Sequence, residues 1–402
     1  MGMSFPGRRN IMKKLISLTL AAAMTMSLLA GCGSNSSAGT DSADASAETF
    51  KIGGIGPITG AGAVYGIAVK NGAELAIKEI NEAGGINGYQ IEYNFQDDEL
   101  DNEKSVNAYN TLKDWGMNML VGSVTSGCCV AVAAESKNDN MFQITPSGSS
   151  VDCIEGNDNV FQVCFTDPNQ GVGAADYIGE NSLASKVAVI YDSSDVYSSG
   201  IYAKFKEEAA TQNFEIVSEE AFTADNKTDF SVQLAKAQEA GAELVFLPIY
   251  YTEASLILKQ ADSMGYAPKF FGCDGLDGIL GVENFDTSLA EGVMLLTPFA
   301  ADAQDDLTKK FVSAYEAAYN DTPNQFAADA YDAVYAIKAA AEKGDVAPSD
   351  GVSGICDKMK AAMQEITVNG LTGEGMNWAA DGTVNKAPKA MEIKNGAYAL
   401  VQ

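Results

Sequence analysis

The stretch FKIGGIGPITGAGAVYGIAVKNGAELAIKEINEAGG, residues 50–85, shows the unit from which the rest of the chain is built. Its apolar start, residues 50–56, predicts a strand, and the spacing of Val69, Ala73 and Ile80 predicts one apolar face of a helix. The glycines between them complete neither the G-x-G-x-x-G pattern of dinucleotide-binding loops nor the G-x-x-x-x-G-K-[ST] phosphate loop. The stretch therefore predicts a strand, a tight turn that permits close backbone approach, and a helix.

The same alternation of strand and helix patterns continues to about residue 147 and starts again at KVAVIYD, residues 186–192. Repeated strand–helix units form parallel sheets covered by helices, so two series predict an α/β fold with two similar lobes. Two long helical patterns and a hairpin with Asn395-Gly396 at its turn complete the chain. Ligands of open α/β sheets bind at the carboxyl ends of the strands, so the loops there are the candidates for a site.

Composition narrows the function. The 402 residues include no histidine, which removes Ser-His-Asp and Cys-His catalysis and imidazole metal sites. With 26 basic and 54 acidic residues the net charge is −28, and such a surface repels nucleic acid and anionic lipid. We therefore expect a binding protein with no cofactor, no metal and no nucleic-acid partner, and a surface hydrolase is the weaker alternative.

The start of the chain is typical of an exported protein. MKKLISLTLAAAMTMSLLAGC, residues 12–32, has two lysines before an apolar run that is too short to span a bilayer. The small residues before Cys32 resemble a bacterial lipobox, which implies removal of a signal peptide (1–31) and lipidation of Cys32; an ordinary signal peptide with an incidental cysteine is the alternative. Residues 33–48 contain no large apolar side chain, so 32–49 is expected to be the lipidated cysteine and a flexible linker.

Two loops in the first lobe favour an anion, and loops in the second offer a carboxylate. GSVTSGCC (122–129) and TPSGSS (145–150) carry small hydroxyl residues but no Arg or Lys, which suits a single carboxylate rather than a phosphate. In the second lobe, 195–200, 249–251 and 272–275 supply tyrosines and Asp274. An acid opposite a carboxylate-binding loop predicts a site for an amino-acid zwitterion. A capping role for any one serine, and a solvated turn for Asp274, are the simpler alternatives.

These residues resemble a known family. From residue 50 onward, GPITGAGAVYG, LVGSVTSG, FQITPSGSS, DSSDVYSSG, FLPIYYTEA and FFGCDG resemble the branched-chain amino-acid-binding proteins of ABC importers, of the type 1 periplasmic-binding fold. The resemblance implies two Rossmann-like lobes with parallel central sheets, hinged by three crossovers. It implies an N-terminal lobe of residues 50–168 and 298–388 and a C-terminal lobe of 169–297 and 389–402.

The resemblance also implies a role for single residues. Ser126 would bind the ligand carboxylate, Ser147 and Ser149 the carboxylate and ammonium, and Asp274 the ammonium. The residues expected to line the cleft or its side-chain pocket are Tyr65, Tyr197, Tyr250, Gly127 and Cys128. The positions of the disulfide found in enteric members hold Leu100 and Thr125, so the pairing of the remaining six cysteines stays open.

The resemblance implies an extracytoplasmic, lipid-anchored monomer that passes an amino acid to an ABC permease in the membrane. Two alternatives keep the same fold. One is the binding of an amide, urea-like or aromatic ligand, and the other is a sensory receptor.

Overall fold

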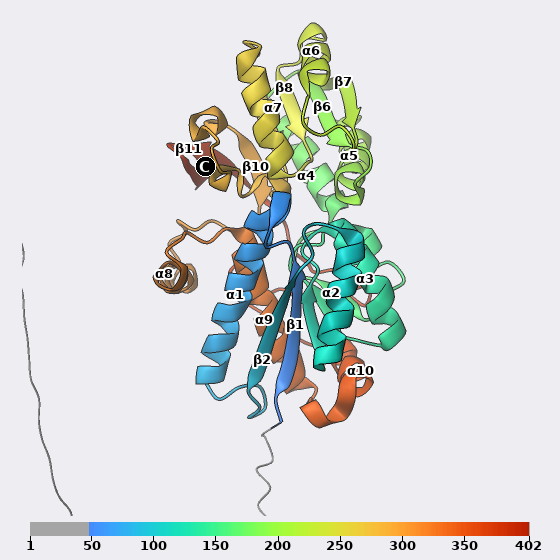
Figure 1. The fold of residues 1–402 in the computed structure, drawn as a ribbon. Helices are drawn as coiled ribbons and strands as arrows, with labels where there is room; N and C mark the ends of the chain where they lie inside the picture. Colours follow the sequence, from blue (N-terminus) through green and yellow to red (C-terminus); the bar gives the residue numbers. More distant parts are fainter. Residues whose placement is uncertain (1–47, 402) are drawn as a thin grey trace, which may run out of the picture. The chain divides into compact units, whose positions relative to one another are not determined.

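The computed structural model describes residues 48–401 (Figure 1). The expected signal peptide, the lipidation site Cys32 and residues 33–47 of the expected linker lie outside the described residues. The predicted first unit is confirmed as β1 (Phe50–Gly56), the 3-10 turn η1 (Gly60–Gly62) and α1 (Ala63–Glu82). Two glycines of α1 allow the close approach, because a Cβ at Gly66 would lie 1.8 Å from the Pro57 carbonyl oxygen and one at Gly72 2.0 Å from that of Ala327.

The first sheet has five parallel strands in the order β2-β1-β3-β4-β5. Its three short strands, β3, β4 and β5, consist of buried residues throughout, as expected for a parallel sheet covered by helices. Helix α1 packs against α9, and α2 packs against α3 on the opposite side of the sheet (Figure 1). The further elements of this lobe are β2 (Ile91–Asp97), α2 (Asn102–Trp115), β3 (Met119–Gly122), α3 (Ser126–Asp139), β4 (Gln143–Thr145), η2 (Val151–Cys153) and β5 (Val160–Gln162).

The second sheet has seven strands in the order β12-β11-β10-β9-β8-β6-β7. Strands β6 to β10 are parallel, whereas β11 and β12 form the predicted antiparallel hairpin at its edge. The bounds are α4 (Asp167–Glu180), β6 (Lys186–Asp192), α5 (Val196–Ala209), β7 (Glu215–Phe222), α6 (Ser231–Glu239), β8 (Leu244–Leu247), α7 (Tyr251–Ser263), β9 (Lys269–Gly272), η3 (Asp274–Leu276), η4 (Ile279–Gly281), η5 (Thr287–Ala290), β10 (Met294–Thr297), β11 (Lys389–Lys394) and β12 (Ala397–Leu400).

The chain passes between the two sheets three times, after β5, after β10 and before β11. Helices α8 (Asp306–Tyr319), α9 (Gln325–Lys343) and α10 (Gly351–Met363), with η6 (Pro348–Asp350), lie between the second and third passages. Two lobes with parallel central sheets and three crossovers confirm the predicted fold class. The residue-level lobe boundaries stay a prediction.

Several details differ from the sequence-based expectation. Helix α3 begins at Ser126 rather than after Cys129, since Thr125 is its extended N-cap, and α5 begins inside the stretch 195–200 that we expected to be a loop. Small residues carry no apolar periodicity, so these first turns resemble loops in the sequence. Strand β5 has only three residues and was not predicted; neither were α4 and α10. The six cysteines from 128 to 356 are free, buried thiols.

Candidate functional site

The two hydroxyl-rich loops of the first lobe follow neighbouring strands, β3 and β4, as predicted. They are tied together by Ser126, whose Oγ accepts hydrogen bonds from the backbone N–H groups of Ser149 (3.2 Å) and Ser150 (3.1 Å). The α3 N-cap, Thr125, makes no side-chain capping bond. Because Thr125 occupies the N-cap position, Ser126 is the first residue of the helix and does not cap it. Helix capping therefore does not explain the serine at this position.

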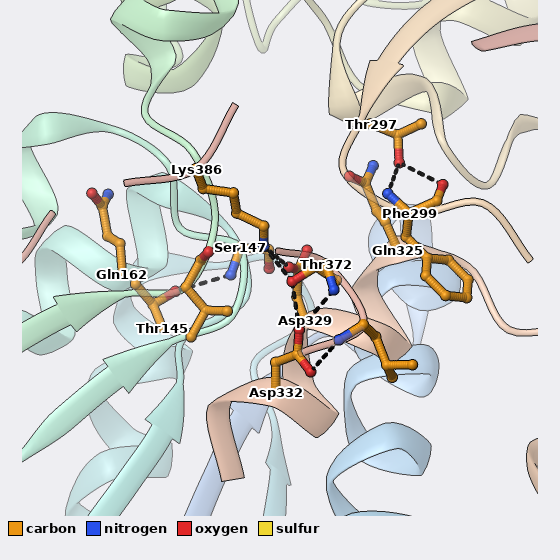
Figure 2. Close-up of polar contacts among 12 residues, drawn as sticks. Thr145, Ser147, Gln162, Thr297, Phe299, Gln325, Asp329, Asp332, Thr372 and Lys386 are labelled. Carbon is orange, nitrogen blue, oxygen red and sulfur yellow. Dashed lines mark hydrogen bonds and ion pairs between the residues drawn. The ribbon is translucent and has the colours of Figure 1, made fainter. Parts of the chain in front are cut away.

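The second of these loops, 145–150, is held in shape from within the lobe. The Thr145 hydroxyl accepts the N–H groups of Ser147 (3.3 Å) and Gly148 (2.7 Å), a contact that Figure 2 shows beside Gln162. The Gln162 amide donates to the carbonyls of Gly148 (2.8 Å) and Ser150 (3.0 Å). The Ser147 hydroxyl donates to the Val124 carbonyl (2.7 Å), so both its O–H and its N–H already have partners within the lobe.

Two hydroxyls next to these contacts have no partner. Thr125 Oγ1 and Ser149 Oγ are buried, and neither makes a hydrogen bond within the described residues. Buried polar atoms in folded proteins are almost always paired, and leaving one unpaired is costly. Two such atoms in adjacent loops indicate a place where a polar ligand completes the hydrogen bonding.

In the second lobe, Asp274 follows β9 and is 4% exposed. Tyr197 Oη donates to its Oδ1 at 2.8 Å and accepts the Gly275 N–H at 2.9 Å. Burial raises the pKa of Asp274 to about 7, although the Tyr197 hydroxyl lowers it in part. Asp274 is thus a buried acid held by Tyr197, and the alternative of a solvated turn residue is wrong.

The tyrosines expected in the cleft lie together and connect the lobes. Tyr65, in the first turn of α1, donates a hydrogen bond to the Gly275 carbonyl and accepts the Tyr251 N–H at 3.2 Å. The rings of Tyr197 and Tyr250 are stacked with centroids 4.9 Å apart, and Tyr65 meets Tyr250 edge-on at 5.7 Å. These aromatic side chains form a wall next to the Asp274 carboxylate.

A narrow cavity of about 10 Å³ lies between these groups. Its lining includes six of the nine residues predicted for the cleft and its side-chain pocket; the full lining is Tyr65, Val124, Thr125, Ser126, Ser147, Tyr197, Tyr250, Asp274, Gly275 and Phe326. A larger cavity of about 450 Å³ shares Thr125 and Tyr250 with it and is also lined by Gly127 and Cys128. Ser149 lines neither cavity and is joined to the lining by its N–H, which donates to Ser126 Oγ. The structure thus brings together Tyr65, Ser126, Ser147, Tyr197, Tyr250 and Asp274, with Gly127 in the adjoining space.

Sequence reasoning missed one acid. Asp167, in the first turn of α4, is buried, and its Oδ2 has no hydrogen-bond partner within the described residues. Burial raises its pKa well above the ordinary value, and Asp274 raises it further; the nearby Ser149 hydroxyl lowers it in part without meeting hydrogen-bond geometry. Asp167 therefore lies close to a predicted site residue of each lobe, Ser149 in the first and Asp274 in the second. Thr166 before Asp167 and Pro168 after it are a helix-start signal that would have placed this acid at a strand end.

A buried ion pair lies where the crossovers meet α9. Lys386, on the third crossover, extends toward Asp329 and Thr372 (Figure 2), with its Nζ 2.5 Å from Asp329 Oδ1 and 2.5 Å from Thr372 Oγ1. The same Nζ donates to the Val163 carbonyl of the first crossover at 3.0 Å. Lys386 therefore joins two crossovers to the first lobe. The Asp329 charge also contributes to the raised pKa of Asp274.

Within residues 48–401, no helix is long and apolar enough to cross a membrane. Nor does the described part of the chain hold a group of three or more acidic or cysteine side chains arranged for a metal ion.

Two sheets joined by three crossovers, with polar loops of both lobes around one cavity, define the class of two-lobed solute-binding proteins. The chain belongs to the periplasmic binding protein family, which residues 49–397 match. It is 30% identical over 317 residues to the leucine-, isoleucine-, valine-, threonine- and alanine-binding protein of Pseudomonas aeruginosa, covering 79% of this chain and 84% of that one. It is 33% identical over 308 residues to Leu/Ile/Val-binding protein homolog 3 of Brucella melitensis, covering 75% and 81%.

Solved structures agree with this assignment. The crystal structure of the branched-chain amino acid transporter substrate-binding protein LivJ from Streptococcus pneumoniae, in complex with isoleucine, superposes with a TM-score of 0.79 at 31% identity, covering 87% of this chain and 98% of that one. A solute-binding protein of an ABC transporter from R. palustris, in complex with benzoate, has a TM-score of 0.77 at 20% identity, covering 88% and 96%. This second likeness concerns the fold alone.

Proposed function

We propose that this protein is the extracytoplasmic substrate-binding subunit of an ABC amino-acid importer, and that it binds a branched-chain or similar amino acid between its lobes. The observation that carries the proposal is a buried acid, Asp274, in a cavity whose other lobe contributes Ser126 and the unpaired hydroxyl of Thr125. A zwitterion has one charge for each side of such a cavity.

The ligand carboxylate would lie against the first lobe. The Ser126 Oγ already accepts two N–H groups, so its own O–H remains free to donate. The unpaired hydroxyls of Thr125 and Ser149 are further donors. All of these lie at the start of α3 or beside it, where the helix dipole favours a negative charge.

The ligand ammonium would lie against Asp274. A pKa near 7 in the empty site leaves this carboxyl partly protonated at neutral pH, and a bound cation would favour the charged form. The unpaired Oδ2 of Asp167 would contribute a further hydrogen-bond acceptor nearby. The ring faces of Tyr197 and Tyr250 suit a cation as well, because aromatic faces are electronegative.

The ligand side chain would extend into the adjoining cavity beside Gly127 and Cys128. Burying an aliphatic side chain contributes only about 1.5–3 kcal/mol, so discrimination among leucine, isoleucine and valine is expected to be weak. The Pseudomonas relative, which is named for five amino acids including threonine and alanine, supports a broad preference.

Anchoring and the permease partner belong to the same proposal; the anchor rests on residues 12–32, and the permease partner rests on the likeness to binding proteins of ABC transporters. A lipid on Cys32 would hold the protein at the outer face of the membrane, with the residues that follow as a tether to the binding unit. Cell fractionation tests this part: the protein should be found with the membrane, and Cys32→Ala should release it. Equal membrane association of the variant would contradict the lipid anchor.

A thermal-shift screen tests the ligand class, since a ligand that binds only the folded state raises the melting temperature. Aliphatic amino acids should stabilise the protein, whereas the matching amides and N-acetyl amino acids, which each lack one charge, should not. Stabilisation by benzoates, or by amides and urea, would replace the proposal with the corresponding ligand class. If the protein binds an amino acid but deletion of its gene does not reduce uptake of that amino acid by the cells, a sensory receptor is favoured instead.

A further inference from the structure

A separate cavity of about 460 Å³ lies where the second-lobe turn 277–281 and hairpin β11–β12 meet α8 and the segment before α9. Figure 1 shows α8 and β11 on the same side of α1. The cavity shares no lining residue with either cavity of the proposed amino-acid site. It is therefore a distinct space, to which both lobes contribute.

The carboxylate of Asp277 lines this cavity and is 4% exposed. Its Oδ2 accepts the Gln325 N–H at 3.0 Å, but its Oδ1 has no hydrogen-bond partner within the described residues. Burial raises the pKa of Asp277 to about 6, against the lowering effects of the Gln325 N–H and of the nearby Tyr398 hydroxyl, although the Tyr398 hydroxyl does not meet hydrogen-bond geometry with either carboxylate oxygen. A buried carboxylate oxygen without a partner is costly, which is the mark of a group that a ligand completes.

The rest of the lining defines the chemistry of that ligand. No Lys or Arg lines the cavity, and its lining includes three exposed acids, Asp302, Glu316 and Asp321. The apolar part of the lining includes Val64, Leu280, Phe299 and Val312, and Thr297, Thr322, Asn324 and Tyr398 are polar. The acids do not converge on one point as metal ligands do, since the described residues contain no such group. A cation with an apolar body fits better than a metal ion.

We propose that this cavity is a second binding site, for a small organic amine whose ammonium pairs with Asp277 and whose alkyl part packs against Phe299 and Leu280. The ammonium supplies the donor that Asp277 Oδ1 lacks, and the exposed acids of the lining attract the cation before it enters. The site is independent of the proposed amino-acid site, because it uses neither Asp274 nor the serine loops.

Titration of the mature protein with n-butylamine, followed by calorimetry and NMR, tests the proposal. The Asp274→Asn variant serves as the background, because it removes the acid with which the proposed amino-acid site would bind an amine. Saturable binding should persist in this background and should fall by about tenfold or more when Asp277→Asn is added, since an ion pair in a buried site is lost. The uncharged n-butanol should bind far more weakly.

A second variant and a control make the result specific. A Cβ at Gly281 has as its nearest neighbour Val64 Cγ2, 3.7 Å away, which is an ordinary contact, so Gly281→Leu would narrow the cavity without removing a charge. It should also abolish amine binding, whereas Asp114→Asn, an exposed acid on α2, should not change it. Absence of saturable binding in the Asp274→Asn background, or equal affinity with Asp277→Asn or Gly281→Leu in folded protein, would overturn the second site and leave the amino-acid site untouched.

Discussion

Tyr197 Oη donates a 2.8 Å hydrogen bond to the Asp274 carboxylate and accepts the N–H of Gly275, so one hydroxyl fixes both the acid and the backbone next to it. The Asp274 backbone is held as well, by Gln170 on its N–H (3.1 Å) and by Gln325 on its carbonyl (2.9 Å). A buried acid held from several directions is preorganised for a cationic partner. This arrangement makes Asp274 the residue with the largest expected effect on ligand binding.

Replacing Asp274 with Asn should weaken amino-acid binding by about 3–5 kcal/mol, the usual cost of leaving a buried charge without its partner. Titration calorimetry with isoleucine or leucine measures it, and Asp114→Asn is the control. The empty protein should be no less stable, because burial raises the pKa of Asp274 and makes its charged form unfavourable at pH 8. Near-wild-type affinity of the variant would remove Asp274 from the site.

Amino-acid affinity should depend on pH through the same residue. Folding raises the pKa of Asp274 to about 7, and a bound ammonium lowers it again, so the ligand selects the deprotonated form. Affinity should therefore be constant above about pH 7.5 and fall by up to about tenfold per pH unit below pH 7. Calorimetry from pH 5 to pH 8 measures the profile.

Asp195 also lines the larger cavity, and burial raises its pKa to about 6. Its titration would therefore contribute to the pH dependence of binding in the same range. Comparison with Asp274→Asn isolates the contribution of Asp274, since the variant should lose the steep region near pH 7. A profile that is flat in the wild-type protein, or equally steep in the variant, would show that Asp274 does not carry the charge that binds the ligand.

Two serines of the first lobe should behave differently when mutated to Ala. Ser149 Oγ has no partner in the empty protein, so Ser149→Ala should leave the melting temperature unchanged or raise it, while weakening binding by about 1–2 kcal/mol. Ser126 Oγ accepts two N–H groups, so Ser126→Ala should weaken binding and also lower stability. Thermal melts together with calorimetry separate the two. Equal destabilisation by both variants would contradict the unpaired state of Ser149.

The Lys386–Asp329 pair should matter for stability rather than for ligand chemistry. Lys386 is 1% exposed at its side chain, so Lys386→Met leaves a buried carboxylate without its cation, which costs about 3–5 kcal/mol. Urea unfolding measures the loss. The double variant Lys386→Met/Asp329→Asn should recover part of it, because the uncompensated charge is removed too. Additive losses in the double variant would show that the two side chains act independently.

Much of the fold follows from local patterns. The strand at KVAVIYD and the turn at Asn395-Gly396 lie where the sequence predicts them, because continuous apolar runs and turn dipeptides act through short-range physics. Strand β5 and the first turn of α3 were not predicted, because three residues or a run of small side chains carry no periodic signal. Their structure depends on neighbours that are distant in the sequence.

Some residues of the candidate site could likewise be predicted from the sequence, and others could not. The serine loops and Asp274 could be predicted from their positions after strands, and the family resemblance supplied their roles. Asp167 could not be singled out, because its significance lies in burial next to Ser149 and Asp274, which only the folded chain brings about. The ion pair of Lys386 with Asp329 was missed for a similar reason, since 57 residues separate its two members.

A crystal structure of the protein with bound leucine or isoleucine tests the central claim most directly. The account predicts the ligand between the lobes, with its ammonium within hydrogen-bonding distance of the Asp274 carboxylate and its carboxylate at the Ser126 and Ser149 hydroxyls. A ligand bound elsewhere, or one whose ammonium faces away from Asp274 in the occupied cleft, would contradict it.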